Sequence, residues 1–325
     1  MEYTALGRTG LKVSRLCLGT MNFGVDTEEK EAFKIMDMAL DAGINFFDTA
    51  NGYGWRVYAG RTEEIIGKWF AQGGRRREKV VLATKVYGEM NNPLEGPNDP
   101  PGLSAYKIRR HLEDSLRRLQ TDHIELYQMH HVDWNVTWDE IWGAFEVAVQ
   151  QGKADYIGAS NFPGWKLMEA QKEAISRHFL GLVSEQHRYN LNCRLPELEV
   201  LPAAQYLGIG VIPWGPLDGG LLGGNAIKKV PGSRTEKDDR FEKYRHKLEQ
   251  FSNLCKEIGE REDTVALAWL LSNPAVTAPI IGCRTADQFE QSLRSVEVKL
   301  EDWALKRIDE IFPGPGGKAP EAYAW

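Results

Sequence analysis

Four side chains in the sequence have the chemistry needed to deliver a proton to a carbonyl oxygen: Asp48, Tyr53, Lys85 and His130. A tyrosine has an ordinary pKa of about 10 and is a weak acid at neutral pH. A nearby ammonium group stabilises the phenolate and lowers that pKa, and a carboxylate beside the ammonium keeps it charged. We therefore expect Tyr53 to donate the proton, Lys85 to lower the pKa of Tyr53, and Asp48 to pair with Lys85.

His130 completes this catalytic set, because an imidazole could orient the carbonyl oxygen or share in the proton transfer. His131 follows it, and the alternation of side chains along a strand would turn His131 away if His130 faces inwards. The set supplies a proton but no nucleophile or metal, so it suits reduction of a carbonyl with hydride from a cofactor. A different chemistry is also open, in which Lys85 forms a Schiff base in a barrel isomerase or aldolase.

Polar or aromatic residues end strands that are otherwise apolar. This pattern indicates where in the fold the four catalytic candidates lie. Any one of them, taken alone, could simply be the polar end of a strand. The ends of parallel strands lie at one face, however, and in barrel enzymes that face carries the active site. The residues at these ends are Asp48, Lys85, His130, Asn161, Gln186, Trp214 and Arg284.

The elements that must position these residues alternate between strand and helix. Near-continuous apolar runs indicate parallel strands covered by helices, and glycines such as Gly43, Gly152 and Gly208 end helices just before a strand. This alternation predicts an α/β fold, a (β/α)₈ TIM barrel forming one domain over residues 1–325. No G-x-G-x-x-G follows a strand, which argues against a Rossmann site. The expected strands are 15–19, 44–48, 80–85, 124–130, 156–158, 182–186, 210–212 and 278–282.

Some segments do not follow the alternation of strand and helix, and we expect each to have a separate role. A short hairpin over residues 3–13 is expected to plug one end of the barrel. Long loops at 88–102 and 213–244 are predicted to lie over the C-terminal face, where the glycine-rich start of the second loop and the tail from Pro313 would close over ligands. Thr27 is predicted to cap the helix that carries Phe33, Met36 and Leu40.

Composition narrows the classes of protein that remain. The chain has 325 residues, 42% of them hydrophobic and 26% charged, with a net charge of −6. The densest basic cluster, residues 75–77, is too short to follow a nucleic-acid backbone, and no apolar run approaches the roughly 20 residues of a membrane span. The four cysteines are isolated and no Cys or His group has metal-ligand spacing, which indicates a cytoplasmic protein without a metal site.

Beyond these residue-level arguments, the sequence resembles the aldo-keto reductase superfamily over nearly its whole length. The resemblance implies a (β/α)₈ barrel that binds NADPH without a Rossmann domain. It also places the family's Asp, Tyr, Lys and His tetrad on Asp48, Tyr53, Lys85 and His130. The motifs that carry it are LGTM (18–21), NFFDTA (45–50) followed by Tyr53-Gly54, ATK (83–85), LYQMHHVD (126–133), GASNF (158–162) and IPWGPL (212–217).

The resemblance further implies the residues that hold NADPH. Ser160, Asn161 and Gln186 would hold the nicotinamide amide, and Trp214 would stack on the ring. Arg284, at a helix start with Thr285 and Gln288 in a capping-box pattern, would hold the adenosine end and its 2′-phosphate. The full implied set is Gly19, Thr20, Met21, Asp48, Ser160, Asn161, Gln186, Trp214, Gly215, Pro216, Leu217, Gly219, Leu221, Gly282, Arg284, Thr285, Gln288 and Ser292.

The sequence departs from the family pattern at two places. Ser292 stands where many relatives have Asn near the adenine, and His131-Val132 replaces residues often seen after the catalytic His. Trp55, Tyr87 and Trp134 are expected to wall the substrate site.

Several expectations concern the natural role of the chain. Trp55, residues 60–67 and the 88–102 loop look most like bacterial members related to potassium-channel β-subunits, some of which act on sugar-derived carbonyls or deoxysugar intermediates. We expect a small-molecule carbonyl substrate and a possible homo-oligomer, with no nucleic-acid or membrane partner. The alternative is a cofactor-binding regulatory subunit with little turnover.

Overall fold

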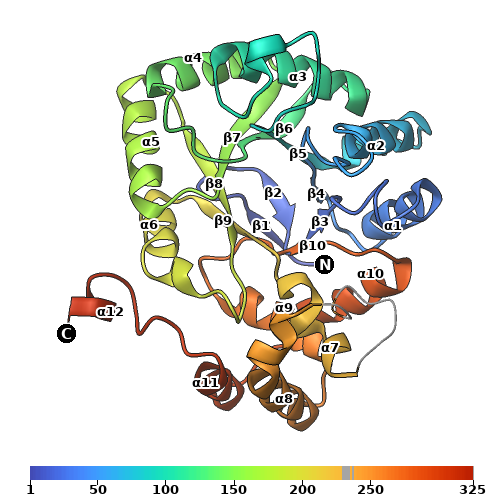
Figure 1. Cartoon of the computed structure of the whole chain (residues 1–325), viewed down its shortest axis with the longest axis vertical. Helices are drawn as coiled ribbons and strands as arrows, with labels where there is room; N and C mark the ends of the chain where they lie inside the picture. The colour runs from blue at the N-terminus through green and yellow to red at the C-terminus, as the bar shows by residue number, and fades with distance from the viewer. Residues whose placement is uncertain (229–234, 236–237, 325) are drawn as a thin grey trace.

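The computed structural model describes residues 1–228, 235 and 238–324, and its centre is a sheet of eight parallel strands. Each strand from β3 to β9 pairs with the next along the chain, as the alternation of strand and helix predicts (Figure 1). The strands are β3 (Cys17–Gly19), β4 (Phe46–Asp48), β5 (Val81–Val86), β6 (Ile124–Met129), β7 (Ala154–Ser160), β8 (Leu182–Arg188), β9 (Gly210–Trp214) and β10 (Ile280–Ile281).

The sheet closes on itself through the last strand. Ile280 and Ile281 of β10 pair in parallel with Cys17 and Leu18 of β3. On the other side, a parallel bridge joins Val276 to Val211 of β9, and Thr277 N donates to the Val211 carbonyl oxygen at 2.8 Å. The predicted (β/α)₈ barrel is therefore confirmed.

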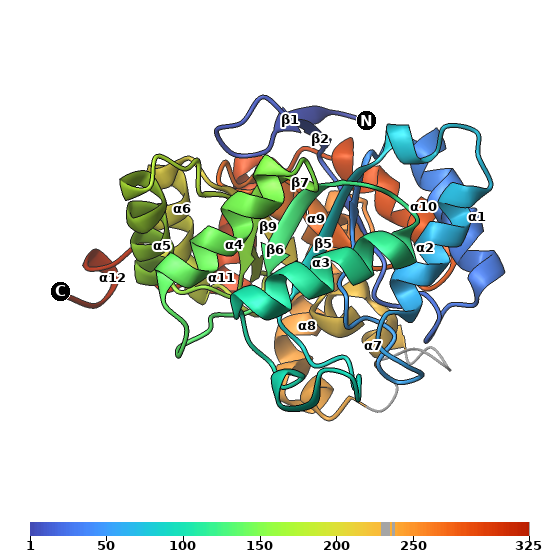
Figure 2. The ribbon, with the colours of Figure 1, turned by 90° about the horizontal axis from the view of Figure 1, so that it is seen from above.

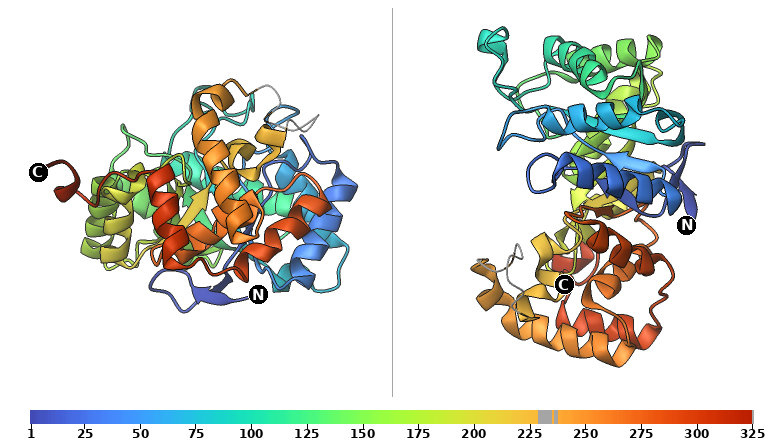
Figure 3. Two further views of the ribbon diagram at one scale, coloured as in Figure 1. Left: turned by 90° about the horizontal axis from the view of Figure 1, so that it is seen from below. Right: turned by 90° about the vertical axis from the view of Figure 1, so that its right-hand side faces the viewer.

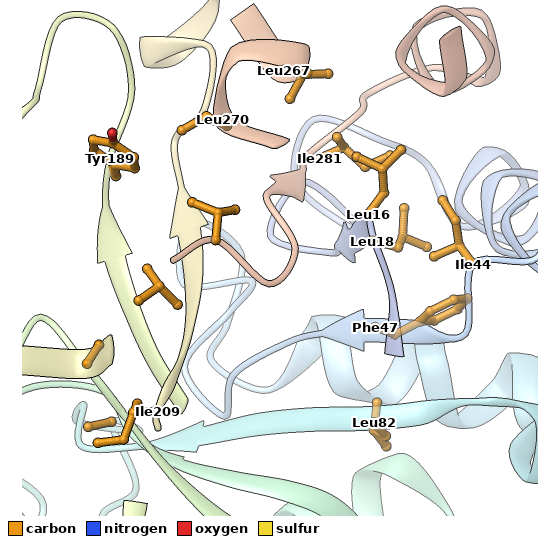
Figure 4. Packing of buried hydrophobic residues seen from close by; sticks show 14 of the residues in the cluster. Leu16, Leu18, Ile44, Phe47, Leu82, Tyr189, Ile209, Leu267, Leu270 and Ile281 are labelled. Carbon is orange, nitrogen blue, oxygen red and sulfur yellow. The ribbon is translucent and has the colours of Figure 1, made fainter. Parts of the chain in front are cut away.

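Helices surround the barrel and bury apolar faces against its outside. In α3, Ile108, Leu112, Leu116 and Leu119 are all buried at helical spacing. Figure 4 shows part of this outer core, where Leu16, Leu18 and other side chains pack between strands and helices. The main helices are α1 (Glu29–Asp41), α2 (Arg61–Ala71), α3 (Ala105–Leu119), α4 (Trp138–Gln150), α5 (Gly164–Ser176), α6 (Val200–Leu207), α7 (Asn225–Lys228), α8 (Arg240–Ile258), α9 (Glu262–Ser272), α10 (Ala286–Leu293), α11 (Asp302–Ile311) and α12 (Glu321–Ala324).

A threonine side chain caps α4, but the predicted threonine cap of α1 does not form. Thr137 caps α4 by accepting from Glu140 N at 3.4 Å. Thr27 does not cap α1: the N-cap is Glu28, and the Thr27 hydroxyl instead donates to the Arg284 carbonyl oxygen at 3.0 Å. That prediction was wrong because Thr27 is held by a residue near the other end of the chain, which local sequence does not reveal.

The N-terminal hairpin covers one end of the barrel, as expected. Strands β1 (Tyr3–Ala5) and β2 (Lys12–Ser14) pair antiparallel. The hairpin lies on one side of the molecule, whereas α7 and α8 lie on the opposite side (Figures 2 and 3). Leu6 and Val13 join an inner apolar cluster with Phe46 and Leu126. Apolar side chains therefore fill the interior of the barrel at the end that the hairpin covers.

The long segments at the other end are only partly loops. The 88–102 segment contains one 3₁₀ turn, η2 (Gly96–Asn98), and lies on the side of α7 and α8 (Figure 2). The 213–244 segment holds η4 (Asp218–Gly223), α7 and the start of α8, and residues 229–234, 236 and 237 of it lie outside the described residues. The tail, expected to lack a helix, forms α12 and projects past α6 (Figure 1).

The described part of the chain contains neither a membrane-spanning helix nor a metal-binding cluster. No helix in it is both long and apolar enough to cross a membrane. Its His, Cys, Asp and Glu side chains form no group suited to a metal ion.

Candidate active site

Strand alternation places one layer of polar side chains inside the barrel. Along β5, Leu82 and Thr84 face the outer helices, whereas Ala83 and Lys85 face the interior. By the same rule Asp48 and Gln128 follow the inward-facing Phe46 and Leu126 by two residues. The apolar end of the interior thus gives way to charge at the C-terminal ends of the strands.

Lys85 is the centre of this layer. Its ammonium is fully buried and donates to Asp48 Oδ2 at 2.6 Å, to the Thr49 carbonyl oxygen at 2.8 Å and to Tyr53 Oη at 3.1 Å. The same ammonium lies 4.8 Å from the centroid of the Tyr53 ring. The structure therefore brings Asp48, Lys85 and Tyr53 together in the arrangement expected from the sequence.

A tight turn delivers Tyr53 to Lys85. Asn51 N donates to the Lys85 carbonyl oxygen at 3.2 Å, and Tyr53 N donates to the Ala50 carbonyl oxygen at 3.1 Å. Gly54 has a φ of +101°, and a Cβ there would come within 2.8 Å of the Tyr58 carbonyl oxygen. Glycine is therefore required at 54, both for its left-handed backbone and for lack of space.

The electrostatics of the pair differ from expectation in one respect. Burial raises the pKa of Tyr53 above its ordinary value of 10, and the opposing effect of the Lys85 ammonium does not offset it. Burial also disfavours the charged form of Lys85, but attraction to Asp48 and Tyr53 outweighs it, so the Lys85 pKa is raised. In the free protein Tyr53 is thus a protonated phenol beside a charged amine, rather than a phenol of lowered pKa.

His130 lies next to Tyr53 with its ring edge-on, the two centroids 6.0 Å apart. Burial, together with Lys85 and His131, holds the pKa of His130 well below its ordinary 6.5, so the imidazole is neutral. No described residue hydrogen-bonds to this ring, which leaves it available to a ligand. The expectation for His131 was wrong: its ring stacks on His130 at 5.0 Å, because β6 ends at Met129 and strand alternation stops there.

The second oxygen of Asp48 is held by two amides. Gln186 Nε2 donates to Asp48 Oδ1 at 2.8 Å, and Gln128 Nε2 donates to the same oxygen at 3.1 Å. The resemblance assigned Gln186 to the cofactor, and no described residue donates to its Oε1, so that atom is left for a ligand. Gln128 was missed, although its inward position two residues before His130 is readable from strand alternation.

Three residues predicted for the nicotinamide form one hydrogen-bonded group. Asn161 Nδ2 donates to Ser160 Oγ at 3.0 Å, and Trp214 Nε1 donates to Asn161 Oδ1 at 3.0 Å. Asn161 Nδ2 also donates to the His130 carbonyl oxygen at 3.1 Å. This network fixes the Trp214 indole relative to the catalytic histidine.

The segment after Trp214 turns sharply and is tied down by a buried carboxylate, Asp218, which was not predicted from the sequence. Asp218 accepts from Arg188 at 2.7 Å, from Arg240 at 2.8 Å and from Asn192 at 3.0 Å. Its partners come from β8, the start of α8 and the loop that follows β8, so no sequence spacing could have grouped them. A Cβ at Gly215 would meet nothing within 4 Å.

The other residues of that segment and of β3 that the resemblance assigned to the cofactor differ in exposure. Leu221 and Pro216 are buried, whereas Leu217 and Gly219 are partly exposed. Thr20 is buried and donates through Oγ1 to the Asp48 carbonyl oxygen at 2.8 Å, directly after Gly19. Met21 is exposed.

Arg284 stands at the start of α10, as predicted. Thr285 caps this helix by accepting from Gln288 N at 3.3 Å, and Gln288 Oε1 accepts from Arg284 N at 2.9 Å. Among the described residues, no carboxylate pairs with the Arg284 guanidinium, and Gly282 two residues before it is exposed. Ser292, by contrast, is buried and donates its hydroxyl to the Gln288 carbonyl oxygen at 3.0 Å, so while that bond lasts it could only accept a hydrogen bond from an adenine.

Aromatic side chains surround the tetrad unevenly. Trp55 is 53% exposed and its ring centroid lies 6.0 Å from that of Tyr53, whereas Tyr87 packs edge-on against His131 at 5.2 Å. Trp134 instead packs on Trp165 at 5.9 Å. Trp55 and Tyr87 are therefore placed beside the tetrad, and Trp134 contacts none of its rings.

Taken together, the groups that remain free match an anionic dinucleotide. The Arg284 guanidinium can donate to a phosphate group. Gln186 Oε1 can accept from an amide group, and the space beside Gly215 leaves room for a phosphate. The residues present therefore fit the cofactor that the sequence implies.

Comparison with known proteins agrees with this chemistry. Residues 15–312 match the Aldo/keto reductase family. The chain is 66% identical over 326 residues to the uncharacterized oxidoreductase YrpG of Bacillus subtilis (strain 168), with all of both chains covered. It is 33% identical over 341 residues to a putative aryl-alcohol dehydrogenase of Schizosaccharomyces pombe, covering 95% of each chain. It is also 33% identical over 342 residues to a probable voltage-gated potassium channel subunit beta of Arabidopsis thaliana, covering 99% of this chain and 100% of that protein.

Proposed function

The chain belongs to the aldo/keto reductase family of oxidoreductases, and we propose that it reduces an aldehyde or ketone to the alcohol with NADPH. The observation that carries the proposal is the contact of Tyr53 Oη with the buried Lys85 ammonium at 3.1 Å. A phenol in this position can release its proton to a developing alkoxide, because the phenolate left behind is stabilised by the adjacent cation.

Each residue of the tetrad has a separate task in this reaction. Tyr53 gives its proton to the carbonyl oxygen, and Lys85 stabilises the resulting phenolate. Asp48 holds Lys85 charged and in place at 2.6 Å. His130, which is neutral, can donate a hydrogen bond to the carbonyl oxygen and so orient the substrate against Tyr53.

NADPH would be held by the residues already described. Ser160, Asn161 and Gln186 would bind the nicotinamide amide, with Trp214 against the ring. The segment from Gly215 to Leu221 would cover the pyrophosphate, and Arg284 would bind the 2′-phosphate through a charge-assisted contact. When bound, this cofactor supplies the hydride that the protein itself cannot.

Two other functions are less well supported. A Schiff-base enzyme needs a neutral amine at Lys85, but attraction to Asp48 and Tyr53 raises the pKa of this group and keeps it charged. A regulatory subunit, as the name of the Arabidopsis relative suggests, would not require Tyr53 to be positioned for proton transfer. The geometry of the tetrad therefore favours an enzyme.

The substrate is proposed to be a small molecule with a flat face beside its carbonyl group. Trp55 and Tyr87 offer ring surfaces next to Tyr53 and His131, and such surfaces stack on aromatic rings and on sugar rings. The name of the Schizosaccharomyces pombe relative favours the aromatic class, and a sugar-derived carbonyl is the second class. The four free cysteines fit a cytoplasmic enzyme, and self-association stays a prediction.

A carbonyl panel tests the proposed function directly. Purified protein is mixed with NADPH and a set of aromatic aldehydes, sugar-derived aldehydes and ketones, and oxidation of NADPH is followed by its near-ultraviolet absorbance. We expect turnover with at least one class and a matching alcohol product. Tight NADPH binding without turnover of any carbonyl would favour the regulatory subunit instead.

A further inference from the structure

A second buried histidine, His111 of α3, connects two segments that the proposed mechanism leaves separate. His111 Nδ1 lies 2.8 Å from Asn51 Nδ2, and His111 Nε2 lies 3.0 Å from Glu95 Oε2. His111, Asn51 and Glu95 are 1%, 1% and 3% exposed as whole residues, so water does not screen these contacts. A buried titratable group with two specific partners is rarely an accident of packing.

One end of this chain of hydrogen bonds reaches the catalytic turn. Asn51 precedes Tyr53 by two residues, and its backbone N–H donates to the carbonyl oxygen of Lys85. The position of the Asn51 side chain therefore bears directly on the turn that presents the Tyr53 hydroxyl to Lys85.

The other end reaches the 88–102 loop on the C-terminal face. Glu95 belongs to this loop and also accepts from Asn92 Nδ2 at 3.3 Å. A second tie is made by Lys107, which donates to the carbonyl oxygens of Gly88 and Asp99. The loop is thus held to α3 by buried polar contacts rather than by apolar packing.

A cavity of about 310 Å³ lies between this loop, the segment after Tyr53 and α3. It leaves the loop room to move if its ties to α3 change. The residues that line the cavity are Ala59, Met90, Asn91, Asn92, Pro93, Glu95, His111, Asp114 and Arg118.

We propose that His111 is a positioning residue, which fixes the 88–102 loop relative to the Tyr53 turn as long as its ring is neutral. In that state Nδ1 accepts from the Asn51 amide and Nε2–H donates to Glu95. A protonated ring would set its Nδ1–H against the Asn51 NH₂ group. The amide would then have to turn and present Asn51 Oδ1, a buried oxygen that has no partner in this structure.

The charges around His111 support a neutral ring near pH 7. Burial lowers the pKa of His111 below its ordinary 6.5; Lys107 and Arg118 act in the same direction, and Glu95 opposes them. The other charged groups near the cavity are Arg110, whose Nε lies 3.7 Å from Glu95 Oε1, Asp114 on α3, Glu63 on α2, and Glu89 and Asp99 in the loop. Because the folded pKa lies below the unfolded one, His111 contributes stability above pH 6.5 that is lost as the pH falls towards the folded pKa.

This inference rests on the proposed function, since a positioning role presupposes that Tyr53 acts as the acid. The test compares His111→Ala, which removes both hydrogen bonds, with His111→Gln, whose amide can accept from Asn51 and donate to Glu95 but cannot titrate. His246→Ala, at an exposed position of α8, is the matched control. The readouts are kcat and KM, NADPH affinity by fluorescence, and hydrogen exchange of residues 88–102 between pH 5 and 8.

For His111→Ala we expect a roughly tenfold lower kcat with unchanged NADPH affinity, and loop exchange that is fast at every pH. For His111→Gln we expect nearly normal kcat at pH 7.5, and loop protection that no longer falls below pH 6.5. Wild-type loop exchange with no pH dependence beyond the intrinsic chemistry, or unchanged in His111→Ala, would overturn the proposal. Loop exchange requires no turnover, so this outcome is distinct from failure of the carbonyl panel. If His111→Ala does not fold, His111→Gln and Glu95→Gln decide between the outcomes.

Discussion

Two ion pairs with buried carboxylates lie on opposite faces of strand β5, and only one of them has the features of an active site. Lys85 points into the barrel and pairs with Asp48, whereas its neighbour Thr84 points outwards and donates to Glu63 at 2.6 Å. Glu63 is fully buried and pairs with Arg118 of α3 at 2.8 Å. Both carboxylates are held by a cation and by further hydrogen bonds, so burial and charge do not distinguish them.

The difference lies in what else the cation contacts. In the outer pair, Arg118 donates onwards to Ser115, a buried residue of its own helix, so the group is closed. In the inner pair, Lys85 donates onwards to Tyr53, whose hydroxyl can pass a proton to a ligand. A buried ion pair therefore signals catalysis when one of its members reaches a group that can exchange protons.

The largest effect on kcat is expected when the Tyr53 hydroxyl is removed. In Tyr53→Phe the ring stays over Lys85 but the proton donor is lost, so kcat should fall by about 10²–10⁴-fold. NADPH affinity should not change. Steady-state kinetics and fluorescence titration measure the two quantities, with Tyr58→Phe as the control because the Tyr58 hydroxyl donates to Glu64 at the surface. Retention of most of the kcat would remove Tyr53 from the role of acid.

Breaking the outer pair should cost stability rather than rate. Arg118→Met leaves the Glu63 carboxylate buried without its cation, and we expect a loss of about 3 kcal/mol in the free energy of unfolding. At 25 °C the folded variant should keep the kcat of the wild type. Denaturant unfolding provides the measurement, and Arg117→Met is the matched control because Arg117 is 74% exposed. A variant of normal stability but reduced kcat would mean that the outer pair takes part in the chemistry.

A smaller effect should follow from the loss of a partly exposed cation. Arg284→Ala removes the proposed contact to the 2′-phosphate, and a charge-assisted hydrogen bond of about 1.5–3 kcal/mol corresponds to roughly 10- to 150-fold weaker NADPH binding. NADH binding should change little, since it lacks that phosphate. Arg294→Ala, whose side chain pairs with Glu260 and Glu297, serves as the control. Equal losses for both cofactors would indicate a structural role for Arg284.

The smallest effect concerns order rather than rate. If the 215–240 segment closes over NADPH, saturation with the cofactor should slow hydrogen exchange in its peptides. Asp218 already holds the first part of the segment through Arg188 and Arg240, so the change should be modest there. Identical exchange with and without NADPH would mean that the segment does not act as a gate.

The sequence predicted what depends on periodicity. Strands and helices repeat with constant apolar patterns, so the barrel and the inward positions of Asp48 and Lys85 could be deduced before the structure. His131 was misplaced because the strand rule was applied beyond the end of β6 at Met129.

What could not be predicted depends on contacts between distant segments. Asp218 gathers side chains from two separate parts of the chain, residues 188–192 and Arg240, and Thr27 binds Arg284 more than 250 residues away. His111 lies on a helix face that periodicity marks only as buried. Contacts of this kind follow from the closed barrel and have no signal in local spacing.

The closure of the barrel by β10 has a consequence for synthesis of the chain on the ribosome. Strands β3 to β9 can pair one after another as they emerge, but β3 keeps an unpaired edge until Ile280 and Ile281 arrive. Open edges of this kind pair readily with other chains, so the nascent protein is exposed to aggregation until its last strand is made. The sheet of the growing chain therefore keeps an edge that can pair with other chains until Ile280 and Ile281 have been synthesised.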